Sequence, residues 1–190
     1  VYLKLLYRNH IFSKWYQKKE IEKTLEIIED RCNRKVLSWR DHGYRHNRLT
    51  YRILADKGVK VVSNDVTPRK VIPQYICDKL ISLPINVIPD HEHVYHGRRT
   101  KKFVDKYPWR GDAFSNESYS IESWAALALE QTQNIVSQGA IATLLIHPAC
   151  MFLADGFQTF EYICKCLSNY SSHFCSEIPD EMKRRRIGAS

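Results

Sequence analysis

The sequence predicts an α/β fold in which helices cover a mainly parallel sheet. Segments with the apolar period of a helix alternate with short apolar runs typical of strands, the order expected of parallel strands joined by helical crossovers. Polar side chains stand at the ends of these runs, and they are Arg40, Asp65, Asp90 with His91, and His147. In a β/α barrel such ends gather on one face, so we expect a shared site there.

The first half of the chain carries two helical patterns and three strand patterns. Apolar residues recur at helical spacing through 17–30, and this stripe consists of Ile21, Leu25 and Ile28. A second helix is expected over 49–56, because Asn47 is a favourable capping residue and Gly58 a favourable stop. Short apolar runs predict the strands, which are 35–39, 59–63 and, interrupted by Pro84, 80–88.

The second half begins with a polar connection and ends in helices. Residues 97–120 are polar and aromatic and predict a long connecting segment. A strong helix is expected from Ser120 or Ser123 to about Gln138, with Gly139 as its stop. Trp124 falls on the apolar stripe of that helix, which favours core packing over stacking on a sugar ring. A last helix is expected over 157–167.

Residues 144–147 are the most informative in the chain. They predict a buried strand that ends in His147, with residues 140–143 leading in and Pro148 stopping the strand. A titratable side chain at the tip of an apolar strand stands where α/β folds assemble their sites. Histidine suits general acid or base catalysis near neutral pH. A hydrogen-bonded structural histidine is the alternative interpretation.

Two further segments are dense in polar side chains. Residues 90–96, Asp-His-Glu-His-Val-Tyr-His, would suit zinc or another divalent ion, and a polar loop at the mouth of a site is the alternative. Residues 40–46 lie where a predicted strand gives way to a helix. Arg40 could pair there with a carboxylate in a pocket, and a charged loop is again the alternative.

Composition narrows the classes of function. The chain has 190 residues and a formal net charge of +8. The basic run 183–186 could contact nucleic acid, but a solvated tail is favoured, because no zinc-finger spacing or RNA-binding signature accompanies it. No apolar run approaches the ~20 residues of a membrane span, and the first residues lack a signal-peptide layout. The six cysteines form no C-x-x-C pair, which favours reduced thiols and a cytoplasmic location.

Several motifs, taken in order, resemble those of the polysaccharide deacetylase (NodB-homology) family. Residues 38–44, Ser-Trp-Arg-Asp-His-Gly-Tyr, are similar to that family's arginine motif. Residues 47–58 and 61–65 resemble its following helix and next strand tip. Residues 144–148, Leu-Leu-Ile-His-Pro, resemble its late Leu-x-x-His element. The resemblance covers most of residues 10–168.

The resemblance implies a distorted, incomplete (β/α) barrel that removes acetyl groups from carbohydrate by metal-dependent hydrolysis. In the family an Asp and two His hold a divalent metal, usually zinc, while a second Asp acts as base and the late His as acid. The resemblance makes His147 the general acid, Arg40 the partner that orients a catalytic carboxylate, and His10 a metal ligand. The residues expected at the substrate mouth are Tyr44, Asp65, Asp90 and His91.

The chain departs from the family pattern at three points. No segment carries the two adjacent aspartates of the family's opening strand, which we expect upstream of Val1 in a longer parent protein. Leu6 stands where the first histidine of a paired-histidine motif belongs, and His42 replaces the usual proline of the arginine motif. We therefore expect a truncated or degenerate domain over residues 1–175, followed by a basic tail over 176–190.

Three functions follow from these patterns. The first is a deacetylase-like hydrolase of C–N bonds that is active in the intact parent, with carbohydrate as substrate and zinc as the expected metal. The second is a non-catalytic carbohydrate-binding remnant of the same fold that has lost its metal. The third, which ranks last, is a protein that binds nucleic acid through its basic face.

Overall fold

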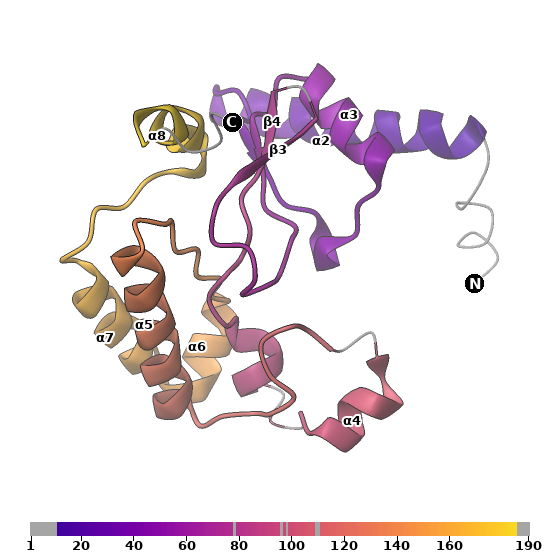
Figure 1. Ribbon diagram of the computed structural model, residues 1–190. Helices are drawn as coiled ribbons and strands as arrows, with labels where there is room; N and C mark the ends of the chain where they lie inside the picture. The colour runs from indigo at the N-terminus through magenta and orange to yellow at the C-terminus, as the bar shows by residue number, and fades with distance from the viewer. Residues whose placement is uncertain (1–10, 78, 96, 98, 109–110, 186–190) are drawn as a thin grey trace. The chain divides into compact units, whose positions relative to one another are not determined.

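The computed structural model describes residues 11–77, 79–95, 97, 99–108 and 111–185 (Figure 1). The fold is mixed α/β, as predicted, and it divides into two compact units. Unit 1 contains the sheet and takes the described residues up to 64, residues 74–82 and those from 174. Unit 2 is mainly helical and takes residues 65–73 and 83–173.

Unit 1 is built on a small open sheet. Its strands are β1 (Ser38–Trp39), β2 (Val61–Val62), β3 (Gln74–Cys77) and β4 (Leu80–Ser82). Their order is β1-β2-β4-β3, in which β1, β2 and β4 are parallel and β3 is an antiparallel edge strand that was not predicted. The register pairs Ser38 with Val61, and Val61 with Ile81. The parallel core of the sheet is as expected, and its described strands do not close into a barrel.

The helical elements of unit 1 are α2 (Ile11–Cys32), η1 (His42–Tyr44), α3 (Arg48–Asp56), η4 (Cys175–Glu177) and α8 (Ile178–Arg184). α2 and α3 pack against each other beside the sheet (Figure 1). Ile21 and Leu25 of the predicted stripe are buried in this core, whereas Ile28 is exposed. α3 contributes Ile53 and Leu54, which is fully buried.

The ends of α3 follow the local signals in the sequence. The Asn47 side chain accepts from the Thr50 backbone N–H at 3.0 Å, and the Thr50 hydroxyl accepts from the Asn47 N–H at 3.2 Å. This reciprocal pair satisfies two donors that a helix start otherwise leaves unbound. At the other end Gly58 takes a φ of 85°, a conformation that glycine adopts without strain.

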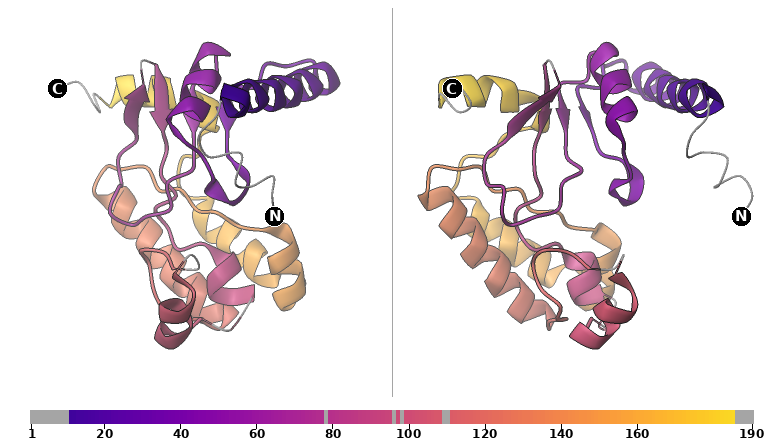
Figure 2. Two further views of the ribbon diagram at one scale, coloured as in Figure 1. Left: turned by 90° about the vertical axis from the view of Figure 1, so that its right-hand side faces the viewer. Right: turned by 45° about the vertical axis from the view of Figure 1, so that its right-hand side comes forward.

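Unit 2 is mainly helical (Figure 2), and its buried apolar side chains form one core. Its elements are the π-helical turn η2 (His91–Tyr95), α4 (Lys101–Lys106), α5 (Ile121–Ser137), α6 (Pro148–Asp155) and α7 (Gln158–Leu167). α5 and α6 both pack against α7 and η2. Trp124 is fully buried, as predicted, and its indole N–H donates to the Ile88 carbonyl at 3.1 Å. α5 and α7 confirm the predicted helices, whereas α4 and α6 were not predicted.

The strand predicted to end in His147 is absent from the structure, and that prediction is wrong. Residues 140–147 belong to no strand, and the buried side chain of Asn86 makes two hydrogen bonds to their backbone. This amide donates to the Ile141 carbonyl at 2.9 Å and accepts from the Thr143 N–H at 2.8 Å. One bond between backbones also joins the two segments, from the Val87 N–H to the Thr143 carbonyl at 3.3 Å. The Asn86 amide, which can both donate and accept, thus makes hydrogen bonds that a neighbouring strand would otherwise make. The strand predicted over 80–88 likewise ends early, at Ser82.

We expect Asn47→Ala to destabilise unit 1 by about 1 kcal/mol, because the start of α3 loses its acceptor. The change should appear as a lower urea midpoint of the unfolding transition that reports on α2 and α3. Asn47→Asp, which keeps the acceptor oxygen, is the matched control and should unfold close to the wild type. Equal midpoints for the alanine variant and the wild type would show that the cap adds nothing to stability.

Candidate functional site

In unit 2, the buried carboxylate of Asp90 forms a hydrogen-bonded pair with His147. Asp90 is fully buried, and both of its oxygens contact the same residue. Oδ1 lies 2.6 Å from the His147 Nδ1, and Oδ2 accepts from the His147 backbone N–H at 2.7 Å. Because an ionised carboxylate only accepts, Nδ1 carries a proton and Nε2 is the nitrogen left for other chemistry. The His147 side chain is 41% exposed, so the imidazole is partly open to solvent.

Local structure fixes both members of the pair. Asp90 follows a buried segment that is held by α5, where the Gln131 side chain accepts from the Ile88 N–H at 2.8 Å. His147 is the N-cap residue of α6. Pro148 takes the first helical position, where its missing N–H costs no hydrogen bond. Two residues 57 apart in the sequence are thereby held in direct contact.

His91 and Cys150 lie beside this pair. His91 opens the π-helical turn η2 directly after Asp90, and such turns occur frequently at functional sites. Cys150 lies on the first turn of α6, three residues after His147, a spacing that brings two side chains to the same side of a helix. His91 Nδ1 is 3.2 Å from Cys150 Sγ, and the rings of His91 and His147 have centroids 4.9 Å apart.

Two imidazoles and one thiol in this arrangement could hold a metal ion. One ligand atom from each of His91, His147 and Cys150 lies within 4.8 Å of the other two. Imidazole nitrogen and thiolate sulfur are ligands that zinc and related ions favour. We call these three residues the His/His/Cys group. His93, from the same ligand-rich segment, belongs to a different network.

The Cys150 thiol is poorly suited to act as a nucleophile. Burial raises the pKa of Cys150 to about 11, and the nearby charge of Asp90 contributes in the same direction. Only the thiolate is nucleophilic, and at neutral pH this thiol is protonated. The contact between His91 and Cys150 is therefore not an activated cysteine–histidine pair.

In unit 1, the ends of β1 and β2 carry a second polar cluster. Arg40 Nε and Nη2 donate to the backbone oxygen and the hydroxyl of Ser63, both at 3.0 Å. Asp41 and Asn64 are joined by two hydrogen bonds, of 2.9 and 2.7 Å. The ends of neighbouring parallel strands thus meet, as expected. In the described part of the chain, the hydrogen bonds of Arg40 go to Ser63 and not to a carboxylate.

The remaining predicted site residues have separate surroundings. Tyr44 ends η1 in unit 1 with a left-handed backbone, φ 57°. Asp65 lies in unit 2, where its carboxylate is 2.9 Å from the Lys70 ammonium. His10, the predicted metal ligand, lies outside the described residues. The predicted site residues that the structure brings into contact are Asp90, His91 and His147.

A second buried network anchors the segment after η2. His93 is fully buried, with Nδ1 2.8 Å from the Glu117 carbonyl and Nε2 2.9 Å from an Asp112 oxygen. The buried Arg99 lies 3.2 Å from the other Asp112 oxygen. Burial acts to raise the pKa of Asp112, but hydrogen bonds from His93 and the Phe114 N–H, with the charges of His93 and Arg99, hold it below its ordinary 3.8. Residues 97–120, for which the sequence predicted only a connecting segment, are thus bound to η2 through His93.

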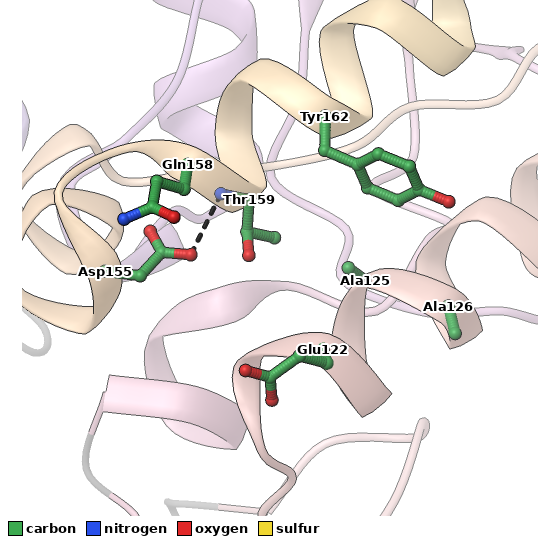
Figure 3. A pocket seen from close by; sticks show the side chains of 7 residues that line it. All are labelled: Glu122, Ala125, Ala126, Asp155, Gln158, Thr159 and Tyr162. Atoms are coloured by element: carbon green, nitrogen blue, oxygen red, sulfur yellow. Dashed lines mark hydrogen bonds between the residues drawn. The ribbon is translucent and has the colours of Figure 1, made fainter.

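A pocket of about 440 Å³ opens at the end of α6 remote from His147 (Figure 3). Its lining residues are Glu122, Ala125, Ala126, Asp155, Gln158, Thr159 and Tyr162. Asp155 Oδ2 accepts from the Thr159 N–H at 2.9 Å, so this carboxylate caps the first turn of α7. His147 is the N-cap of α6 and Asp155 is its last residue. A rise of 1.5 Å per residue therefore puts their backbones roughly 12 Å apart. The pocket is therefore distinct from the His/His/Cys group.

The sequence prediction omitted Cys150 because it treated Pro148 as the stop of a strand. The same proline is also favourable at the first position of a helix. With a helix starting there, the three-residue spacing from His147 would have placed Cys150 at the site. Nothing comparable in the sequence pointed to the ion pairs of Asp112 with His93 and Arg99, which lie 19 and 13 residues earlier in the chain.

Neither a scan against models of protein families nor a search of curated proteins finds a match for this chain. The function is therefore argued from the geometry of the site and from the motifs in the sequence. Within the ranges that the structure describes, no helix combines the length and apolar character required to cross a bilayer.

In the native protein at pH 8, we expect iodoacetamide to label Cys150 far more slowly than Cys164. A thiol with a pKa of about 11 has roughly one thiolate in a thousand molecules at this pH, and Cys150 is also buried whereas Cys164 is exposed. Peptide mass spectrometry over a time course measures both rates. Labelling of Cys150 at the rate of Cys164 would contradict the raised pKa.

We expect Asp112→Asn to destabilise the protein by about 1–3 kcal/mol at pH 7, the range for a buried group that loses its partners. Because folding lowers the pKa of Asp112, its contribution is fully present above pH 4 and is lost as the pH falls through the folded value. The difference between variant and wild type in urea unfolding should therefore shrink on acidification.

The matched control is Asp105→Asn, which removes an exposed ion pair with Lys101 on α4. Its effect on the free energy of unfolding should stay within about 1 kcal/mol at pH 7. A difference for Asp112→Asn that grows as the pH falls would mean that the sign of the pKa shift is wrong.

Proposed function

We propose that this chain carries a deacetylase-like hydrolase site that cleaves the C–N bond of an N-acetylated carbohydrate. The observation that carries the proposal is the pair formed by Asp90 and His147. The resemblance assigns His147 as general acid, and a buried carboxylate holds its Nδ1 at 2.6 Å. A carboxylate in this position fixes the tautomer and orientation of the ring and stabilises the imidazolium.

The chemistry requires a proton donor at the nitrogen of the substrate. Water adds to the acyl carbon, the C–N bond breaks, and the nitrogen leaves as a neutral amine only when it receives a proton. We assign this proton to Nε2 of His147, since Nδ1 is bound to Asp90. The products are acetate and the free amine of the sugar.

Asp90 takes a different role from the one that the sequence suggested. It was expected at the substrate mouth, but it is fully buried and both oxygens contact His147. In this proposal Asp90 is a positioning residue that acts through His147. His91 is half-buried and close to the His147 ring, which supports its predicted role beside the substrate. The substrate roles of Tyr44 and Asp65, and the orienting role of Arg40, stay predictions.

The same proposal includes the incomplete barrel fold and the zinc ion that the resemblance to the family implies. β1, α3 and β2 form a parallel β-α-β unit, which is the repeating element of a β/α barrel, and the sheet is open. When bound, a divalent metal such as zinc polarises the acyl oxygen and activates the attacking water. His10 would be one of its ligands.

We expect His147→Ala to lower kcat for acetate release by ~10²–10⁴, the usual contribution of a positioned acid. The assay uses an oligomer of N-acetylated hexosamine and measures free acetate. Asp90→Asn should cause a loss in the same range, because an amide can donate to Nδ1 and so favours the wrong tautomer. Far-ultraviolet circular dichroism confirms that each variant is folded.

Asp105→Asn is the matched control for Asp90→Asn, since Asp105 is an exposed carboxylate of α4 whose ion pair with Lys101 lies outside the assigned site residues. It should release acetate at the wild-type rate. Unchanged turnover in His147→Ala would refute the catalytic role of this residue. A wild-type chain that binds the oligomer but releases no acetate would support the non-catalytic remnant instead.

A further inference from the structure

We propose that the His/His/Cys group is a zinc site, in which Asp90 positions the His147 ligand. The site uses none of the residues that the resemblance assigns to the catalytic metal. It also draws its ligands from two adjoining elements of one unit, His91 from η2 and the other two from the start of α6.

The ligand atoms suit zinc in type and in spacing. Tetrahedral zinc bound by nitrogen and sulfur separates its ligand atoms by about 3.5 Å. His91 Nδ1 and Cys150 Sγ are 3.2 Å apart, and one ring nitrogen of each histidine lies within 4.8 Å of the other and of Sγ. Small side-chain movements would therefore bring them to a common ion. A thiolate ligand favours zinc over the hard ions calcium and magnesium.

The hydrogen bonds of Asp90 match those of a metal-bound histidine. Histidine ligands almost always donate the other ring N–H to a carboxylate, a carbonyl or water. Asp90 binds Nδ1 of His147 at 2.6 Å, which presents Nε2 as the ligand atom. The ring of His91 is stacked on Tyr95, with centroids 5.7 Å apart, and this contact limits its rotation.

The charges also balance. Zinc binding releases the proton of the Cys150 thiol to solvent. The thiolate and the Asp90 carboxylate then contribute two negative charges, and the ion contributes two positive ones. A partly buried site without net charge avoids much of the desolvation cost that isolated ions would incur. The same ion stabilises the thiolate that burial alone disfavours.

One consequence concerns catalysis, and it rests on the proposed function. Nε2 of His147 is the atom that donates the proton to the leaving amine. A zinc ion bound at this nitrogen removes it from acid catalysis, so occupancy of the site and turnover exclude each other. The metal would therefore act as an inhibitor that is distinct from the metal of the hydrolytic reaction.

The test is titration of the metal-stripped full chain with Co²⁺, the spectroscopic substitute for zinc. Wild type should develop a near-ultraviolet thiolate-to-cobalt charge-transfer band, which added Zn²⁺ abolishes. Cys150→Ser should lack the band, and Cys164→Ser, an exposed cysteine outside the group, should keep it. Asp90→Asn should weaken Co²⁺ binding by ~10–100-fold, the usual effect of removing the partner of a ligating histidine.

A wild type without the band, or a band that persists in Cys150→Ser, would overturn the proposal. If Cys150→Ser is not folded, His91→Asn becomes the deciding variant, because it keeps the thiol and must still lose most of the affinity. A metal site made only of imidazoles and carboxylates gives no thiolate band, so the result is independent of the catalytic metal. Acetate release without the band would uphold the proposed function and reject this site.

Discussion

The structure around the site depends on how one buried carboxylate is satisfied. Asp90 has no contact with solvent, and an unpaired charge in such a place costs several kcal/mol. Both hydrogen bonds to it come from His147, one from the backbone and one from the ring. This constraint fixes the N-cap residue of α6, and with it Cys150 one turn later. It also fixes the start of η2, which carries His91.

A single atom, Nε2 of His147, links the two proposed chemistries. The carboxylate behind a histidine supports proton transfer when the free nitrogen faces a substrate, and it supports metal binding when that nitrogen faces a cation. The thiol of Cys150 distinguishes the two uses, because it adds a zinc ligand but no acid or base that can work near neutral pH. In the two proposals together, the same residues would therefore have an active state and a metal-blocked state.

Strand pairing contributes little to the positions of Asp90 and His147 in unit 2. The Asn86 and Gln131 side chains bind backbone groups that a neighbouring strand would otherwise satisfy. The ion pairs of Asp112 hold the long connection against η2 in the same way. Side-chain hydrogen bonds and ion pairs therefore position the site, while the apolar core around Trp124 provides the rigid support.

The sequence alone determined the elements whose causes are local. Apolar periods, the cap at Asn47 and the glycine stops placed α2, α3, α5 and α7, because these signals act within a few residues. It also singled out His147. Only the tertiary structure decided that residues 144–147 are not a strand, that Asp90 supports His147, and that Cys150 joins the site. Those outcomes depend on hydrogen bonds between residues more than fifty positions apart, for which a single sequence carries no periodic signal.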